Sequence, residues 1–394
     1  MTESLILAFS GGLDTSISVP WLREKFGYDV ITLTVDVGQG EDLKMIERRA
    51  YLAGSSKHVM IDAREEFAKE YVFPALRANA LYEGKYPLAT ALARPLIAQK
   101  LVGVAKSEGS SIISHGCTGK GNDQARFDIT IKALFPSARI IAPVREWNLS
   151  REAELEYASK IALELGTKSE YSIDQNLWGR SIEGGTLEDP AVEPPAEIFE
   201  WVRSISSSPD SPEDLDIGFE DGVPTAINGN PADPVDIIST LNSKAGMHGI
   251  GVIDHVENRI MGLKSREIYE APAALTLIEA HKDLEKLVLT RQELEVKAMI
   301  EAKWAWMVYS GLWIDPLVEA LNAFIDTTQK RVMGHVKIRL HKGSCRVVGR
   351  ESPKSIYNLS LATYGENSTF DQRSAEAFIE IWGMQSRLAK AVAK

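Results

Sequence analysis

The chain has 394 residues, of which 44% are hydrophobic and 25% charged, a composition typical of a globular protein and not of a disordered or fibrous one. The chain is longer than the usual length of a domain with a single hydrophobic core, so two domains that each bury their own core are expected. With 44 Lys plus Arg against 55 Asp plus Glu, the net charge of −11 repels polyanions and makes nucleic acid a poor default partner. A local cluster of amides and cations can still bind a small anionic substrate.

The N-terminal segment and the cysteines indicate the cellular compartment in which the protein is expected. The apolar run Leu5–Phe9 follows no basic stretch and is too short for the core of a signal peptide. No later stretch reaches the length needed to span a membrane. Cys117 and Cys345 lie far apart and form no CxxC pair, so neither a disulfide framework nor a zinc site is indicated. A reducing cytoplasm is therefore expected.

Short apolar runs alternate with helical stretches up to about residue 165, which is typical of a parallel sheet covered by helices on both faces. We therefore predict an α/β domain of a nucleotide-binding type over residues 1–165. Pro20 should remove one hydrogen bond from the first helix. The predicted strands are Leu5–Phe9, Val30–Val35, His58–Ile61, Ser111–His115 and Arg139–Ala142. The predicted helices are Thr15–Phe26, Asp42–Leu52, Phe67–Leu81, Ala89–Ser107, Asn122–Leu134 and Ser150–Leu165.

The regular alternation of strands and helices ends after residue 165. Asp189–Pro195 and Ser204–Pro212 are rich in proline, serine and acidic residues, and are predicted to be loops. Beyond them, strand-like runs are mixed with helices, so residues 166–365 are predicted to form an α+β domain. The strand-like runs are Asp216–Glu220, Val332–Leu340 and Cys345–Gly349, and the helices include Asp233–Lys244 and Arg291–Gly311.

The C-terminal segment, residues 366–394, is predicted to form a helical arm. Its apolar positions follow four- and three-residue spacing and so share one helix face. This face either packs on its own subunit or joins subunits into an oligomer, and the sequence does not decide between the two. The positions are Ala377, Ile381, Met384, Leu388 and Val392.

A glycine-containing loop, AFSGGLDTS, leads from the first predicted strand into the first predicted helix. Its two glycines allow a tight turn, so that backbone amides, hydroxyls and the positive end of the helix can face a phosphate. An ordinary strand-loop-helix turn is the plain alternative. The order Ser-Gly-Gly-x-Asp-Thr-Ser is narrower than that, and resembles the PP-loop of the ATP pyrophosphatases. That resemblance implies that Asp14 helps to hold Mg²⁺, whereas its structural alternative is a helix N-cap.

A second loop, SHGCTGKGNDQARF, follows the fourth predicted strand. It lacks a Walker A pattern, because Ser114 and Gly121 stand where that pattern needs Gly and then Ser or Thr. What remains is a glycine-rich loop that ends on a helix carrying Asp123 and Arg126 on one face. Such a set can bind a zwitterion. The plain alternative is an exposed ion pair beside an ordinary turn.

Together, the two loop motifs resemble those of the argininosuccinate synthases, and further motifs extend the resemblance over nearly the whole chain. These motifs are Ala80–Tyr82, Ala93–Pro95, Ser172–Trp178, Ser181–Gly185, Lys244–Gly251, Val256–Arg259, Lys264–Glu270 and Gly349–Pro353. The resemblance implies a ligase that joins citrulline to aspartate. ATP is cleaved to AMP and pyrophosphate through citrullyl-AMP, with Mg²⁺ on the phosphates. It also implies a homotetramer.

The resemblance assigns roles to matching residues of this chain. It assigns catalysis to Ser10, Asp14 and Asp123. It assigns ATP binding to Ala8, Phe9, Ser10, Gly11, Gly12, Leu13, Asp14, Thr15, Ser16, Gly116 and the backbone near Val35. Aspartate is expected at Thr118, Asn122 and Asp123. Citrulline is expected at Tyr82, the backbone near Pro87, Asn122, Arg126, Ser172, Ser181, Glu257 and Tyr269.

The side-chain chemistry agrees with these roles, because Arg126 can form a fork with a carboxylate and Glu257 can neutralise an α-ammonium. Taken singly, Tyr82, Ser172 and Ser181 are more often surface or capping residues. The alternatives among PP-loop enzymes are an amidotransferase synthetase, which would normally carry a glutaminase cysteine, and a tRNA-modifying enzyme, which would carry catalytic cysteines with a basic face. Neither feature is present. A nucleotide-binding regulator would have no use for a second domain that brings Glu257 and Tyr269 to the first.

Overall fold

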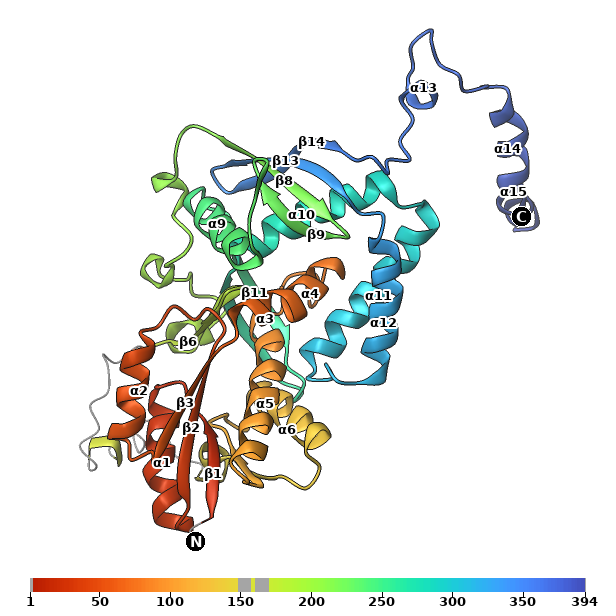
Figure 1. The fold of residues 1–394 in the computed structure, drawn as a ribbon. Helices are drawn as coiled ribbons and strands as arrows, with labels where there is room; N and C mark the ends of the chain where they lie inside the picture. The colour runs from red at the N-terminus through yellow and green to blue at the C-terminus, as the bar shows by residue number, and fades with distance from the viewer. Residues whose placement is uncertain (1–2, 148–156, 160–169, 394) are drawn as a thin grey trace.

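The computed structural model describes residues 3–147, 157–159 and 170–393 (Figure 1). A five-stranded sheet in the order β3-β2-β1-β4-β5 forms the N-terminal half, and every pair of neighbouring strands in it is parallel. All five predicted strands are confirmed, with bounds that differ by at most one residue at each end. They are β1 (Ser4–Ala8), β2 (Asp29–Asp36), β3 (Lys57–Asp62), β4 (Ile112–Ser114) and β5 (Arg139–Ile141).

Helices link these strands and cover the sheet (Figure 1). The helix predicted over residues 67–81 begins earlier and ends at Arg77, with a π-helical segment between two α-helical ones. The helix predicted over residues 150–165 lies outside the described residues, apart from 157–159, which are helical. The helices are α1 (Leu13–Phe26), α2 (Leu43–Leu52), α3 (Arg64–Phe67), η1 (Ala68–Val72), α4 (Phe73–Arg77), α5 (Ala89–Ser107), α6 (Asp123–Leu134) and α7 (Pro143–Trp147).

The C-terminal half contains two antiparallel sheets. The first has the order β10-β9-β8-β13-β14, and the second has the order β11-β12-β7-β6. Three strands of the first sheet were predicted, whereas none of the second was. The first sheet comprises β8 (Glu213–Glu220), β9 (Val223–Ile227), β10 (Asn230–Pro231), β13 (Gly334–His341) and β14 (Ser344–Glu351). The second comprises β6 (Ser172–Asn176), β7 (Gly179–Glu183), β11 (Val252–Asn258) and β12 (Lys264–Glu270).

Four long helices accompany these sheets, and the α+β architecture predicted for this half is confirmed. They are α9 (Pro234–Met247), α10 (Pro272–Val288), α11 (Arg291–Tyr309) and α12 (Pro316–Gln329). The two predicted loops contain only one short 3-10 turn, η4 (Ile205–Ser207), and two further 3-10 turns, η2 (Gly185–Glu188) and η3 (Ala196–Ile198), lie beside the first loop. Within the described ranges, every helix is too short or too polar to cross a lipid bilayer.

One hydrophobic cluster runs through both halves of the chain, so the cores expected for the two domains are continuous with each other. It extends from Ile6 and Leu33 in the parallel sheet, through Leu92 in α5, to Leu277 in α10 and Ile338 in β13. The reason is the helical segment of residues 64–107, which lies between the parallel sheet and the C-terminal half (Figure 1). A smaller cluster covers the opposite face of the parallel sheet, because alternate strand residues point to opposite sides.

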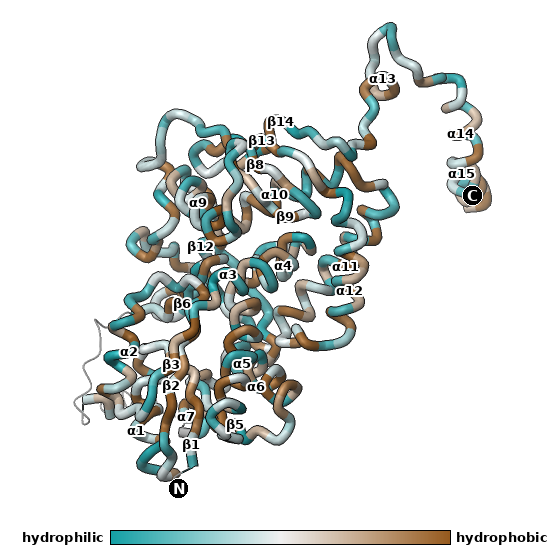
Figure 2. The backbone as a smooth tube through the Cα atoms, viewed as in Figure 1, coloured by the Kyte–Doolittle hydropathy of each residue, from teal (hydrophilic) through white to brown (hydrophobic). Residues whose placement is uncertain are grey.

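The C-terminal arm extends away from the rest of the chain (Figure 1). It contains α14 (Ser374–Trp382) and α15 (Met384–Val392), and Gly383 interrupts the single helix that was predicted. The short helix α13 (Leu359–Ala362) precedes the arm. The apolar side chains are exposed, with Ile381 and Trp382 each at 71%. Figure 2 shows hydrophobic residues along this arm, away from the rest of the chain. The alternative in which this face packs on its own subunit is therefore wrong for the described structure.

Candidate functional site

The two glycine-rich loops meet at the carboxyl edge of the parallel sheet. β1 lies between β2 and β4 in the sheet. After the first loop the chain continues to β2, on one side of β1, and after the second loop it continues to β5, on the other side. Such a switch point is where open α/β sheets bind ligands. A Cβ atom on Gly116 would lie 3.0 Å from the Thr15 methyl carbon and 3.8 Å from the Asp14 Cβ. The second loop therefore lies directly against the first turn of α1.

The first loop has the geometry of an anion cradle. Gly11 has a φ of +77°, which favours glycine, and Gly12 is the N-cap of α1. The backbone N–H of Gly12 donates to Ser10 Oγ at 3.3 Å, and the Thr15 hydroxyl donates to the Gly12 carbonyl at 3.3 Å. Asp14 lies in the first helical turn, so the alternative that it is the N-cap is wrong. The cradle thus carries a carboxylate where a helix N-terminus favours negative charge.

Val35 lies near the carboxyl end of β2, beside this loop in the sheet. Its side chain is buried, so only its backbone can face a ligand. The Gln39 side chain donates to the Val35 carbonyl at 3.4 Å and accepts from the Val37 N–H at 2.9 Å. Phe9 continues β1 by donating its N–H to the Leu33 carbonyl at 2.8 Å.

The second loop is held at its base by His115. His115 Nδ1 accepts from the Cys117 N–H at 3.2 Å, so Nε2 carries the proton and donates to Asp128 at 2.8 Å. The Gln124 side chain donates to the Gly119 carbonyl at 2.6 Å. Thr118 lies at the exposed tip between these anchors. The base of the loop is fixed, while its tip faces solvent.

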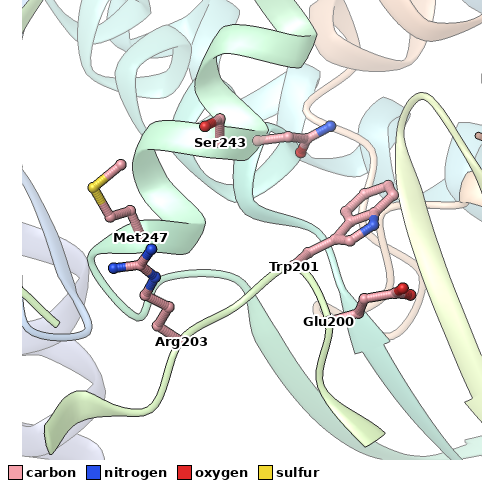
Figure 3. Close-up of a pocket in the computed structure, with 6 residues that line it drawn as sticks. Glu200, Trp201, Arg203, Ser243 and Met247 are labelled. Atoms are coloured by element: carbon pink, nitrogen blue, oxygen red, sulfur yellow. The ribbon is translucent and has the colours of Figure 1, made fainter. Parts of the chain in front are cut away.

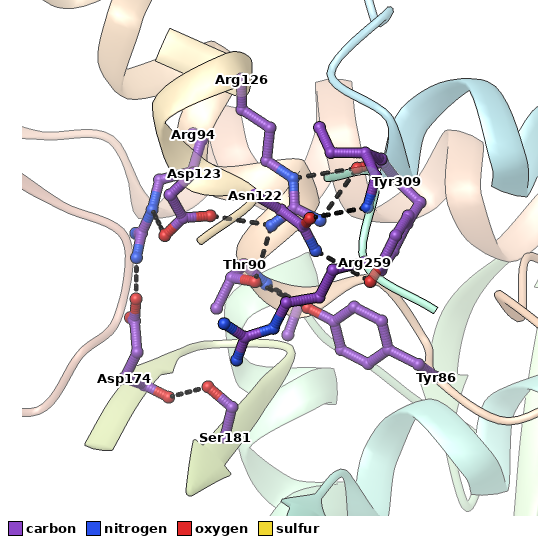
Figure 4. A network of polar contacts seen from close by, with 12 residues as sticks. Tyr86, Thr90, Arg94, Asn122, Asp123, Arg126, Asp174, Ser181, Arg259 and Tyr309 are labelled. Carbon is purple, nitrogen blue, oxygen red and sulfur yellow. Dashed lines mark hydrogen bonds and ion pairs between the residues drawn. The ribbon is translucent and has the colours of Figure 1, made fainter. Parts of the chain in front are cut away.

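Asp123 lies between two arginines at the start of α6 (Figure 4). Arg94 Nε donates to Asp123 at 2.7 Å, and Arg126 Nη1 donates at 2.8 Å. Burial alone would raise the pKa of Asp123, but the two guanidinium groups hold it below its ordinary value. Arg94 also pairs with Asp174 on β6. Because Arg126 is only 3% exposed, the alternative of a plain exposed ion pair is wrong.

The Arg126 guanidinium is held by the C-terminal end of α11 (Figure 4). Its Nε and Nη2 donate to the Tyr309 carbonyl at 3.1 and 2.9 Å, while Nη1 donates to Asp123 and also to Thr90 at 3.4 Å. The edge of Arg126 that would form a fork with a carboxylate thus lies on a backbone oxygen. In this arrangement a substrate carboxylate would meet a single N–H of Arg126.

Glu257 is a buried carboxylate that accepts hydrogen bonds from two tyrosines. The Tyr269 hydroxyl donates at 2.6 Å and the Tyr309 hydroxyl at 2.5 Å. Burial, together with the charge of Glu257, raises the pKa of both phenols, so both remain protonated donors. Asn122 Nδ2 donates to the Tyr309 hydroxyl at 2.8 Å, which joins Glu257 to α6.

Tyr82 and Pro87 lie in the turn before α5. Tyr82 is buried, so its surface alternative is wrong, and its hydroxyl donates to the Asn258 carbonyl at 2.7 Å. Burial and nearby Glu83 raise the pKa of Tyr82 to about 12. The Pro87 carbonyl accepts from the indole N–H of Trp178 at 2.9 Å and is therefore already engaged.

Ser172 and Ser181 lie on the hairpin β6–β7. Ser181 pairs with Tyr269 across the sheet, and its hydroxyl donates to the Asp174 carbonyl at 3.2 Å (Figure 4). Ser172 is exposed at the start of the edge strand β6. The structure therefore joins Ser181 to the network, whereas Ser172 lies at its margin.

A separate cavity of about 340 Å³ contains none of the predicted site residues (Figure 3). The backbone N–H groups of Glu200 and Trp201, on its wall, donate to the buried carboxylate of Glu270 at 3.0 and 2.8 Å. We interpret this wall as structural. The lining residues are Glu200, Trp201, Arg203, Asn242, Ser243 and Met247.

The network residues that were not predicted from the sequence include Arg94 and Tyr309. Arg94 belongs to the motif Ala93–Pro95, which is one of those that carried the resemblance. A basic residue in such a motif could have been proposed as a partner for Asp123. Tyr309 gave no such signal, because it lies 183 positions from Arg126 in the sequence and contacts it only through the fold. Among the described residues, no cluster of three or more His, Cys, Asp or Glu could hold a metal ion.

Comparison with protein-family models gives two matches. The model described as arginosuccinate synthase N-terminal HUP domain matches residues 4–164. The model described as arginosuccinate synthase C-terminal domain matches residues 171–389. The first match covers the parallel sheet with both loops, and the second covers the antiparallel sheets with Glu257, Tyr269 and Tyr309.

Similar proteins are found in distant organisms. The argininosuccinate synthase of Pyrococcus furiosus is 57% identical over 385 residues, which cover 98% of this chain and 94% of the relative. Those of Dictyoglomus turgidum and Thermosynechococcus vestitus are 55% and 53% identical, and each alignment covers 98% of this chain and 97% of the relative. The models span almost the whole chain, and these relatives share more than half of its residues, so the chain belongs to the argininosuccinate synthase family.

Proposed function

We propose that this ligase joins citrulline to aspartate at the carboxyl edge of its parallel sheet, with ATP cleaved to AMP and pyrophosphate. The observation that carries the proposal is the contact between the two loops at Thr15 and Gly116. It brings an anion cradle next to the buried polar network that contains Asn122 and Glu257. One site therefore offers both phosphate chemistry and amino-acid chemistry.

ATP binds with its phosphates against residues 8–16 and its remaining part towards Val35 and Gly116. The backbone amides at the start of α1 and the helix dipole favour the negative charge of phosphates. The buried Ser16 hydroxyl has no hydrogen-bond partner among the described residues, which supports a ligand that completes its bonding. Ser10 shares a hydrogen bond with Thr15 at 3.2 Å and is placed to turn its hydroxyl towards a phosphate.

Mg²⁺ accompanies ATP in this proposal, with Asp14 as its protein contact. The donor set fits, because Mg²⁺ commonly takes one or two carboxylates and obtains its other ligands from phosphates and water. A dedicated cage of protein ligands is not required for an ion that is held in this way. When bound, the ion neutralises phosphate charge.

The two amino acids occupy the network between α6 and the β11–β12 hairpin. Aspartate lies at Thr118, Asn122 and Asp123, and citrulline extends from Arg126 towards Glu257. The other proposed citrulline contacts are Tyr82, Pro87, Ser172, Ser181 and Tyr269. Glu257 suits an α-ammonium group because it is a buried anion whose neighbours, Tyr269 and Tyr309, are neutral.

The reaction proceeds in two displacements. The ureido oxygen of citrulline attacks the α-phosphorus of ATP, which gives citrullyl-AMP and releases pyrophosphate. The aspartate amine then attacks the ureido carbon, and AMP leaves with the former ureido oxygen. The protein acts chiefly by placing the reactants and by stabilising charge. Ser10, Asp14 and Asp123 contribute to this placement at the phosphates and at aspartate.

The exposed C-terminal arm supports a proposal about assembly. We propose a homotetramer in which the exposed apolar face of α14 and α15 packs on neighbouring subunits. We also propose domain boundaries near residues 165 and 365. The proposed location of the enzyme is the cytoplasm. The free thiols of Cys117 and Cys345 support a reducing compartment.

ATP consumption that depends on both citrulline and aspartate tests the proposal. We expect AMP and pyrophosphate in equal amounts, with no ADP. With heavy oxygen in the ureido group of citrulline, the label should appear in AMP. Label that stays out of AMP would refute the adenylation step, and turnover without citrulline would refute the ligase reaction itself.

A further inference from the structure

Tyr309 contacts four of the residues to which the proposed function assigns amino-acid binding. It is the last residue of α11 and is 1% exposed. Its hydroxyl contacts Asn122 and Glu257, and its ring stacks on Tyr82. Its carbonyl accepts from Arg126. No proposed role has so far included Tyr309.

The hydroxyl of Tyr309 links two residues of opposite hydrogen-bonding character. It accepts from Asn122 Nδ2 at 2.8 Å and donates to Glu257 Oε1 at 2.5 Å. The Asn122 side-chain amide cannot flip without losing a hydrogen bond, because its Oδ1 accepts from the Ile260 N–H at 3.0 Å. The direction of the chain from Asn122 through Tyr309 to Glu257 is therefore fixed by its ends.

The backbone of Tyr309 fixes a third partner. The Arg126 guanidinium lies at the C-terminal end of α11, where a helix favours a cation. Gly311 has a φ of +78°, and a Cβ there would lie 3.0 Å from the Arg126 Cα. The chain after α11 thus presses closely on α6, which leaves Tyr309 little freedom to move away from Arg126.

We propose that Tyr309 is a positioning residue that sets Asn122 and Glu257 in register, so that aspartate and citrulline meet in the orientation the second displacement needs. This inference rests on the proposed function. Asn122 lies between the two amino acids, whereas Glu257 belongs to citrulline. Loss of the hydroxyl should therefore affect both amino acids and spare ATP, which binds at the other loop.

Tyr309→Phe removes only this hydroxyl, and Tyr71→Phe is its matched control. Tyr71 is also buried, its hydroxyl donates to Gln99 at 3.0 Å, and its ring stacks on Trp313 at 4.7 Å. Within the described ranges, the hydrogen-bond and ring partners of Tyr71 are Gln99, Phe67 and Trp313, none of which is a proposed site residue. Both variants lose one buried hydroxyl and keep a stacked ring, but only Tyr309→Phe loses hydrogen bonds to proposed site residues.

The experiment measures the Michaelis constant of each substrate, kcat and thermal unfolding for the wild type and both variants. For Tyr309→Phe we expect the citrulline and aspartate constants to rise roughly tenfold each, since a hydrogen bond to a charged group is lost, with the ATP constant nearly unchanged. Tyr71→Phe should leave all three constants unchanged. Because Asn122 acts partly through Tyr309, the double variant Tyr309→Phe, Asn122→Ala should be less impaired than the two single effects multiplied.

Three results would overturn the inference. They are unchanged amino-acid constants in Tyr309→Phe, an equal rise in all three constants, or failure of Tyr309→Phe to fold when Tyr71→Phe folds. The last would mean that the hydroxyl serves the fold. Inactive wild-type protein with citrulline and aspartate would refute the proposed function instead, so the two failures are distinguishable.

Discussion

The Tyr82 ring lies flat against the Tyr309 ring, with centroids 3.5 Å apart and planes 3° apart. Tyr82 comes from the turn before α5 in the N-terminal half, and Tyr309 ends α11 in the C-terminal half. The stack therefore joins the two halves of the chain at the proposed citrulline site. The Tyr82 hydroxyl adds a second link through the Asn258 carbonyl, in β11.

Two replacements of Tyr82 distinguish the contribution of its ring stack from that of its hydroxyl hydrogen bond. Tyr82→Leu removes the ring pair, which is worth about 0.5–1.5 kcal/mol beyond its buried area, so unfolding free energy should fall by at least that amount. The citrulline constant should rise as well. Tyr82→Phe keeps the stack and should have the smaller effect on both. Urea unfolding and steady-state kinetics compare them, and equal effects of the two variants would argue against a role for the stack.

Replacement of Gly116 tests the contact between the loops. In Gly116→Ala the new methyl lies 3.0 Å from the Thr15 methyl, and Thr15 cannot rotate away without loss of its hydrogen bonds to Ser10 and Gly12. The loops should separate slightly, and the ATP constant should rise several-fold.

Gly103→Ala is the matched control for this loop variant. Gly103 is exposed in α5, and a Cβ there meets nothing within 4 Å. Alanine should leave the ATP constant unchanged and stabilise the helix by roughly 0.5–1 kcal/mol. An ATP constant that is the same in Gly116→Ala and the wild type would show that the loop contact does not shape the nucleotide site.

Replacement of Asp14 tests the proposed metal contact. Asp14→Asn should lose most turnover and need more Mg²⁺, because an amide is a weaker ligand for this ion. Stability should fall by only about 0.3–1 kcal/mol, the usual effect of one charge at a helix N-terminus. Asp315→Asn, at the N-cap of α12, makes the same chemical change away from the loops and should keep full activity. Unfolding in parallel with the loss of activity would indicate a structural role for Asp14.

The sequence predicts the parallel sheet well because its strands are continuous apolar runs. Val30–Val35 in β2 is buried along its whole length, and such runs are distinct from the flanking helices. The hairpin β6–β7 has no comparable pattern. β6 reads Ser-Ile-Asp-Gln-Asn, with its first two residues exposed, and polar edge strands resemble loops in sequence.

The candidate site likewise has one part that the sequence predicts and one part that it does not. The two loops stand next to strand ends, so their place at one sheet edge follows from the parallel order of the strands. Glu257 and Tyr269 reach the site only through the antiparallel register that sets Tyr269 opposite Ser181 and Ile253. Tyr309 depends on how α11 ends against α6. These contacts are tertiary, and no local pattern in the sequence specifies them.

Replacement of Glu257 tests the proposed citrulline contact, which is built from residues far apart in the sequence. Glu257→Gln keeps the shape of the side chain, and its amide can still bond both tyrosine hydroxyls, so the fold should survive. Loss of a charged contact costs about 1.5–3 kcal/mol, which corresponds to a roughly ten- to hundredfold rise in the citrulline constant.

The aspartate and ATP constants of Glu257→Gln should move far less, because neither substrate is placed at this carboxylate. Asn122→Ala should differ, since Asn122 is proposed to contact both amino acids and donates to the Tyr309 hydroxyl at 2.8 Å. It should raise the citrulline and aspartate constants together. Titration of each substrate with its partners at saturation measures these constants. An equal change in all three for Glu257→Gln, or no change in any, would mean that the β11–β12 hairpin does not bind citrulline, even if the overall reaction is correct.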